Sequence, residues 1–69
     1  MDIGKPSKYQ VFYDTYEGIW KVMEGNRTIS KHNKKSKATK RGKQKARSAN
    51  AEIVIFKKND ALQERIDYS

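Results

Sequence analysis

The sequence predicts a small α+β domain, in which five strands form an antiparallel sheet and a single helix packs on one of its faces. Apolar and aromatic residues alternate with polar ones towards both ends of the chain, which is typical of strands buried on one side. The middle of the chain instead places small residues four positions apart, as a helix does. With 69 residues, the chain is expected to form one domain with a small core. Because it contains no cysteine, no disulfide supports this core.

The first elements are expected to be an arm and a strand. Residues 1–8 are polar and include Pro6, so we expect a flexible arm that precedes a single domain over residues 9–69. A strand is predicted from Tyr9 to Tyr16. Its alternation places Tyr9, Val11 and Tyr13 on one face and Gln10, Phe12 and Asp14 on the other.

Two more strands are predicted before the helix. The turn Glu17-Gly18 leads into a strand from Ile19 to Glu24, in which Trp20 and Val22 share a face. Gly25-Asn26 fits a two-residue hairpin turn, because both residues tolerate a positive φ. A more polar strand from Arg27 to His32 follows this turn.

A helix is predicted from about Ser36 to Asn50, with Asn33 or Ser36 as its N-cap. One side of this helix carries Ala38, Gly42, Lys45, Ala46 and Ala49, and the other carries Lys37, Lys40, Lys43, Gln44 and Arg47. Because Ala38, Gly42 and Ala46 are small, we expect the helix to lie close to the sheet, seated on the large side chain of Trp20.

The remaining residues predict a hairpin. Glu52 to Lys57 is rich in β-branched and aromatic residues and gives the strongest strand signal in the chain. The chain is expected to turn over residues 58–61 and to end in a strand from Leu62 to Tyr68. One face of that strand carries Leu62, Glu64, Ile66 and Tyr68. The expected order is therefore β-β-β-α-β-β.

Positive charge is concentrated in one internal segment. Ten basic residues and no acidic residue lie between residues 25 and 51, whereas the other 42 residues hold six basic and eight acidic groups. The net charge of +8 therefore originates in this segment. Its members repel one another, and a polyanionic partner would explain why they occur together.

We therefore expect the protein to bind nucleic acid, either DNA or RNA, through the lysine-rich helix, largely electrostatically and with little sequence specificity. Like charges three or four positions apart repel along the helix, and the lysines at its N-terminal end oppose the helix dipole. Phosphates along the outer face would offset both penalties. The expected phosphate contacts are Lys34, Lys35, Lys37, Lys40, Arg41, Lys43 and Arg47.

The sequence leaves other interpretations of the basic helix open. A lysine-rich face can be solvated surface alone, and short basic runs also match nuclear import motifs. A small phage-type interaction protein or inhibitor would use the same helix to dock on an acidic host protein. A sheet edge or a tyrosine-rich face can form an assembly contact, so a monomer or a weak dimer is expected.

No enzyme activity is expected. His32 has no cysteine, histidine or carboxylate near it in the sequence, so it is interpreted as an ordinary strand-end residue, and no catalytic, metal or cofactor site is predicted. Most aromatic residues are expected in the core, with Phe12 and Tyr16 the better candidates for exposed stacking platforms. No apolar segment is long enough for a membrane span or a signal peptide, so we expect a location in the cytoplasm of a bacterium or an infected host cell.

Several short motifs in this order match a known family. They are Tyr9-Gln10-Val11, Trp20-Lys21-Val22, Gly25, Arg27, Ser30, the small residues Ala38, Gly42 and Ala46, Ile53-Val54-Ile55, Asp60 and Tyr68. The pattern, which covers about residues 8–69, resembles the small bacterial and phage proteins grouped as domain of unknown function 2188. The resemblance implies a shared fold but no activity, because the family has no settled function.

The chain departs from this family pattern at two places. The family typically opens its helix with Thr-Lys and acidic residues, where this chain has Lys34-Lys35-Ser36-Lys37. The family usually has Asp-Gly at the last turn, where this chain has Asp60-Ala61. The first departure adds to the positive charge at the start of the helix.

Overall fold

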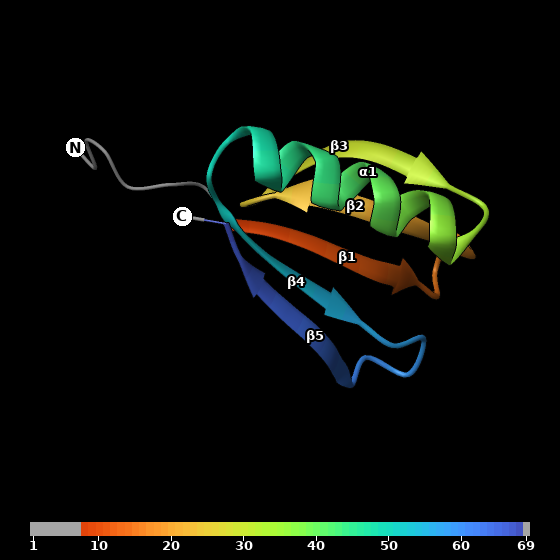
Figure 1. The fold of residues 1–69 in the computed structure, drawn as a ribbon. Helices are drawn as coiled ribbons and strands as arrows, with labels where there is room; N and C mark the ends of the chain where they lie inside the picture. Colours follow the sequence, from red (N-terminus) through yellow and green to blue (C-terminus); the bar gives the residue numbers. More distant parts are fainter. Residues whose placement is uncertain (1–7, 69) are drawn as a thin grey trace.

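The computed structural model describes residues 8–68 and contains five strands and one helix in the expected order (Figure 1). Their bounds are β1 Lys8–Asp14, β2 Ile19–Glu24, β3 Arg27–His32, α1 Lys35–Ser48, β4 Glu52–Phe56 and β5 Leu62–Asp67. The small α+β fold is thus confirmed. The expected arm over residues 1–8 lies outside the described residues except for Lys8, which begins β1 instead of belonging to an arm.

The sheet is mixed, so the prediction of a wholly antiparallel sheet is wrong for its central pair. The strand order is β3-β2-β1-β4-β5, and β1 pairs with β4 in parallel, with Tyr9 opposite Ile53 and Val11 opposite Ile55. The other three pairs are antiparallel. The reason is topological: α1 carries the chain back along the sheet after β3, so β4 runs in the same direction as β1.

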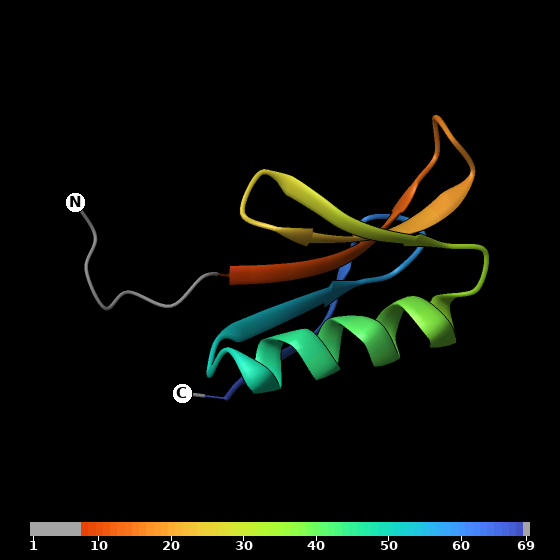
Figure 2. The same cartoon turned by 90° about the horizontal axis from the view of Figure 1, so that it is seen from above.

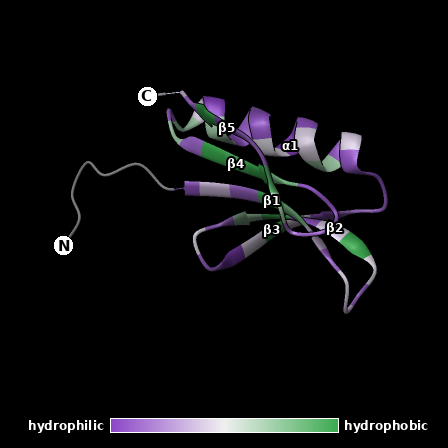
Figure 3. Ribbon diagram, turned by 90° about the horizontal axis from the view of Figure 1, so that it is seen from below, coloured by the Kyte–Doolittle hydropathy of each residue, from purple (hydrophilic) through white to green (hydrophobic). Residues whose placement is uncertain are grey.

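The core lies between α1 and one face of the sheet, and Figure 2 shows the helix as a separate layer on that face. The side chains of Val11, Val22, Ile53 and Ile55 are fully buried there. Figure 3 shows β4 as the most hydrophobic strand, whereas much of α1 is hydrophilic. The helix therefore contributes little apolar area of its own, and the strands supply most of the buried surface.

The helix approaches the sheet most closely at Gly42. A Cβ atom at this position would lie 2.7 Å from Val11 Cγ2 and 2.9 Å from Ile53 Cδ1, which is closer than carbon atoms pack. Gly42 therefore lies directly against Val11 and Ile53, whereas Trp20 belongs to the same core cluster as Ala38 and Ala46. Trp20 lies beneath the start of α1, where Lys35 Nζ is 5.4 Å from its ring centroid.

The buried side of α1 is narrower than the sequence indicated. Ala38, Gly42 and Ala46 are buried as expected, but Lys45 and Ala49 are exposed. Lys45 lies about 60° from Gly42 around the helix axis, at the edge of the inner stripe. Ala49 is the C-cap, beyond the last residue of α1. The contact with the sheet is a single row of small residues.

The two ends of α1 differ in how they are capped. The N-cap is Lys34, with no side-chain hydrogen bond, so the prediction of Asn33 or Ser36 as the cap is wrong. At the other end Asn50 has a φ of 52°, and its N–H donates to the carbonyl of Arg47 at 3.2 Å. The N–H of Ala51 donates to the carbonyl of Ala46 at 2.9 Å, which completes a Schellman motif and directs the chain into β4.

Candidate functional site

The helix α1 and its N-cap carry half of the basic residues of the protein. Eight basic residues lie from Lys34 to Arg47, and the helix has no acidic residue in its first turn. Within the described residues, only Lys43 has a carboxylate nearby, with its Nζ 3.7 Å from Glu64 Oε1. The remaining seven cations of this segment are not neutralised by ion pairs within residues 8–68.

The acidic residues instead pair with cations of the strands. On the face of the sheet away from α1, Lys21 Nζ lies 2.6 Å from Asp14 Oδ2 and 2.7 Å from Glu17 Oε2. Lys31 Nζ lies 3.3 Å from the other oxygen of Glu17. Elsewhere Arg27 pairs with Glu24 at 2.8 Å, and Arg65 pairs with Glu52 at 3.0 Å. The charges are therefore segregated, with balanced strands and an unbalanced helix.

The acidic cluster shifts the pKa values of its members. The hydrogen bond from Lys21 lowers the pKa of the Asp14 carboxyl group, and the backbone N–H of Glu17 lowers it further. Hydrogen bonds from Lys21 and then Lys31 lower the pKa of Glu17. The hydrogen bonds of Lys21 with Asp14 and then with Glu17 raise the pKa of Lys21 itself. The turn between β1 and β2 is thus held by ionised side chains.

The stability of the fold is expected to depend on pH through Asp14. Because its pKa is lower in the folded than in the unfolded state, its stabilising effect is complete above about pH 5 and is lost as the pH falls through the folded-state pKa. We expect the difference in denaturation midpoint between pH 7 and pH 3 to be smaller for Asp14→Asn than for the unmodified protein. An unchanged difference in urea titrations at the two pH values would contradict this role.

A groove runs along the side of α1 that faces β5. The helix covers β1 to β4 but not β5 (Figure 1). The groove consists of two hollows, of about 460 and 600 Å³, which share Lys40 and Lys43. We call it the α1–β5 groove; its lining residues are Lys35, Ser36, Thr39, Lys40, Lys43, Gln44, Arg47, Ser48, Gln63 and Tyr68.

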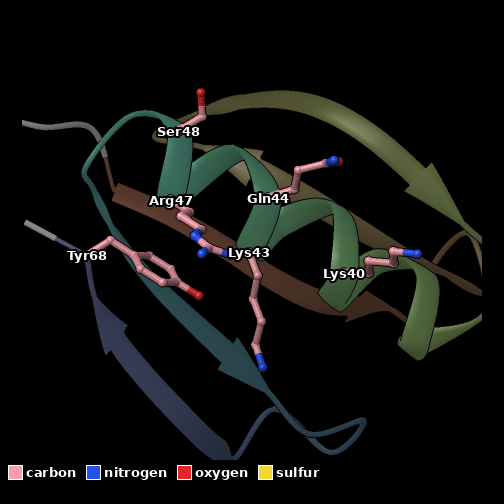
Figure 4. A pocket seen from close by; sticks show the side chains of 6 residues that line it. All are labelled: Lys40, Lys43, Gln44, Arg47, Ser48 and Tyr68. Atoms are coloured by element: carbon pink, nitrogen blue, oxygen red, sulfur yellow. The ribbon is translucent and has the colours of Figure 1, made fainter.

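Figure 4 shows the end of this groove near Tyr68. The ring of Tyr68, just after β5, extends towards the helix, and the side chains of Lys43 and Arg47 extend from the helix on the same side. Ser48 points away from the ring at the upper rim. The ring of Tyr68 is half-buried because it packs partly against the core. An aromatic side chain and several cations thus line one concave surface.

Only some of the predicted phosphate contacts line this groove. Lys35, Lys40, Lys43 and Arg47 line the α1–β5 groove. Lys34, Lys37 and Arg41 are exposed but line neither of its hollows. Lys35 is also engaged within the fold, since its Nζ donates to Gln63 Oε1 and lies over the ring of Trp20. Four of the seven residues therefore line the groove, and the other three are exposed outside it.

The aromatic residues are distributed partly as expected. Tyr9 and Trp20 are buried, whereas Tyr16 is 98% exposed at the turn between β1 and β2. Phe12 is half-buried on the face of the sheet away from the helix. Tyr68 was not expected at the helix, because a strand pattern does not reveal which element its last residue meets. His32 ends β3, where its Nε2 lies 3.0 Å from Ser30 Oγ.

Two further findings concern residues 8–68. Their histidine and carboxylate side chains form no group of three or more that would hold a metal ion. The lysine-rich α1, with 14 residues, is too short and too polar to span a membrane.

A comparison with protein families gives one match. The family described as "Uncharacterized protein conserved in bacteria (DUF2188)" matches residues 9–68, which is nearly the whole chain. No curated protein and no solved structure matches the chain. The match begins at the second residue of β1 and ends at Tyr68, so it includes every strand and the basic helix. The chain therefore belongs to the DUF2188 family of uncharacterized bacterial proteins.

Proposed function

We propose that this protein binds nucleic acid through the outer surface of α1, largely by electrostatic attraction and with little sequence specificity. The observation that carries the proposal is the unbalanced charge of the helix. Of the eight basic residues from Lys34 to Arg47, only Lys43 has a carboxylate partner within residues 8–68. Four acidic side chains, those of Asp14, Glu17, Glu24 and Glu52, pair instead with cations of the strands.

This arrangement costs stability in the absence of a partner. Pairs such as Lys37–Lys40 and Lys43–Arg47 are three or four residues apart, and each such pair destabilises a helix by about 0.2–0.5 kcal/mol. A polyanion lying along the helix adds attractive interactions between each cation and a phosphate, and these outweigh the repulsion. At about 1.5 Å per residue, the 14 residues of α1 extend about 21 Å, which is long enough to contact several phosphates.

Low sequence specificity follows from the kind of basic side chain that the helix presents. Six of the eight cations are lysines, whose ammonium group acts as a point charge on phosphates. Contacts to phosphates position a nucleic acid but carry no information about its bases. We therefore expect affinity to depend on salt much more than on base sequence.

The salt dependence of binding tests the proposal. With about five phosphates neutralised, the logarithm of the association constant for duplex DNA should fall with the logarithm of salt concentration with a slope of about −4 to −5. Fluorescence anisotropy of a labelled duplex between about 50 and 200 mM salt measures this slope. Duplexes of unrelated sequence should give the same values. Absence of binding to any DNA or RNA at the lowest salt would refute the proposal.

An acidic protein partner is the alternative outcome of the same experiments. A shallow salt dependence for nucleic acid, together with tight binding of one purified acidic protein at a salt concentration that abolishes nucleic-acid binding, would favour it. NMR titration with a duplex provides a second criterion. Chemical-shift changes are expected mainly in residues 34–47, and changes confined to the strands would contradict the proposed surface.

A further inference from the structure

We infer that the form of nucleic acid bound here is a single strand, which lies in the α1–β5 groove with a base stacked on the ring of Tyr68. The inference rests on the proposed function and specifies its ligand. It depends on three features of the groove: its row of cations, its aromatic end and its shape.

The cations on this side of α1 follow the direction of the groove. Lys40, Lys43 and Arg47 are spaced three and four residues apart, so they extend over about 10 Å of the helix axis on one side. Across the groove from them, β5 contributes one carboxylate, Glu64, which lies 3.7 Å from Lys43. Lys40 and Arg47 keep their charge uncompensated within the described residues. A phosphate backbone laid along the groove would meet these two cations first.

Tyr68 is held in position before any ligand binds. Its backbone N–H donates to the carbonyl of Ala51 at 3.2 Å, and its ring packs partly against the core while lining the groove. A side chain fixed in this way loses little conformational entropy when a base stacks on it. A basic groove combined with an aromatic platform is the arrangement by which proteins bind single strands without sequence preference.

The same geometry disfavours a duplex in the groove. The bases of a duplex are stacked inside it, so placing one against Tyr68 requires unpairing. A duplex therefore contacts only the outward-facing cations, whereas a single strand reaches both the cations and the ring. Both hollows are shallow and open to solvent, so an extended strand can lie along them.

Two lysine variants test the path of the strand. Lys40 lines the groove and Lys45 does not, although both are exposed lysines of α1 with no ion pair within residues 8–68. For a labelled oligothymidylate at about 0.1 M salt, Lys40→Gln should weaken binding about fivefold, and Lys45→Gln less than about twofold. Equal losses from the two variants would overturn the inferred path.

Variants of Tyr68 test the stacking. Tyr68→Leu should weaken binding of the single strand about tenfold, whereas Tyr68→Phe, which keeps the ring, should bind as the unmodified protein does. Thermal unfolding of each variant shows whether the fold is retained. If Tyr68→Leu unfolds, the ring-proton NMR signals of Tyr68 in the unmodified protein provide the measurement: they should shift on addition of the oligonucleotide, and fixed signals would overturn the stacking.

The outcomes separate this inference from the proposed function. A matched duplex should bind more weakly than the single strand and should be insensitive to Tyr68→Leu. If the duplex binds as tightly as the single strand and both lysine variants lose affinity equally, the groove is not the site, although nucleic-acid binding stands. If neither ligand binds at low salt, both proposals are wrong.

Discussion

Replacing Lys37, Lys40 and Lys43 with glutamine is expected to weaken nucleic-acid binding about 100-fold at about 0.1 M salt. Each lysine that neutralises a phosphate contributes about 0.9 to the slope of log K against log salt on duplex DNA, so the slope should become less steep by nearly three. The variant should fold normally. Its helix loses the repulsion in the Lys37–Lys40 and Lys40–Lys43 pairs, so its thermal midpoint should be unchanged or slightly higher.

A variant with the same net charge provides the control. Lys8, Lys57 and Lys58 are exposed and lie outside α1, at the start of β1 and between β4 and β5, and replacing all three with glutamine also lowers the net charge from +8 to +5. Its affinity should fall much less than that of the helix variant. Equal losses would mean that binding follows the overall charge of the protein and not the helix. Loss of the fold in the helix variant would mean that these lysines are structural.

The substitution Gly42→Ala is expected to destabilise the fold by about 1–3 kcal/mol. In an exposed helix the same change is stabilising, because alanine has a helix propensity about 1 kcal/mol better than glycine. Here the added methyl group would lie 2.7 Å from Val11 Cγ2 and 2.9 Å from Ile53 Cδ1. The Ile53 methyl group ends a flexible side chain, but the buried Val11 is branched at Cβ and has little freedom to move. The helix would have to lift from the sheet.

Thermal unfolding measures this effect, since about 1 kcal/mol changes the midpoint of a domain of this size by roughly 4–8 °C. Lys45→Ala is the matched control, because it improves helix propensity at an exposed position and should alter stability by less than about 0.5 kcal/mol. A midpoint for Gly42→Ala at or above that of the unmodified protein would show that the helix is free to move outward.

The sequence predicted the elements well because their signals are local. The alternation in β1 and β2, the turn at Gly25-Asn26 and the spacing of Ala38, Gly42 and Ala46 each lie within a few residues. The parallel pairing of β1 with β4 was not predicted, because it depends on the path of the chain through α1 and not on either strand. The cap at Lys34 was missed because no side chain there forms the hydrogen bond that sequence rules look for.

The candidate site was predicted as a set of residues but not as a shape. Lysine spacing indicated a basic helix, and the absence of nearby acids in the sequence agrees with the single ion pair, Lys43 with Glu64, that the helix forms within residues 8–68. Which lysines share a concave surface depends on how far the helix extends over the sheet. Because α1 stops short of β5, Lys40 and Arg47 line a groove that Lys37 and Arg41 do not. Tyr68 enters the site for the same reason, from the opposite end of the chain.

The parallel pairing at the centre of the sheet also constrains how the protein is made. Lys8 lies opposite Glu52 and Val11 opposite Ile55, so the middle strand gains its second neighbour only after most of the polypeptide has been synthesised. A nascent chain that ends before β4 has one side of β1 unpaired and lacks Ile53, against which the helix packs at Gly42. Contacts between such distant residues slow folding and make it cooperative, so truncated products should be substrates for proteases and not partly active forms.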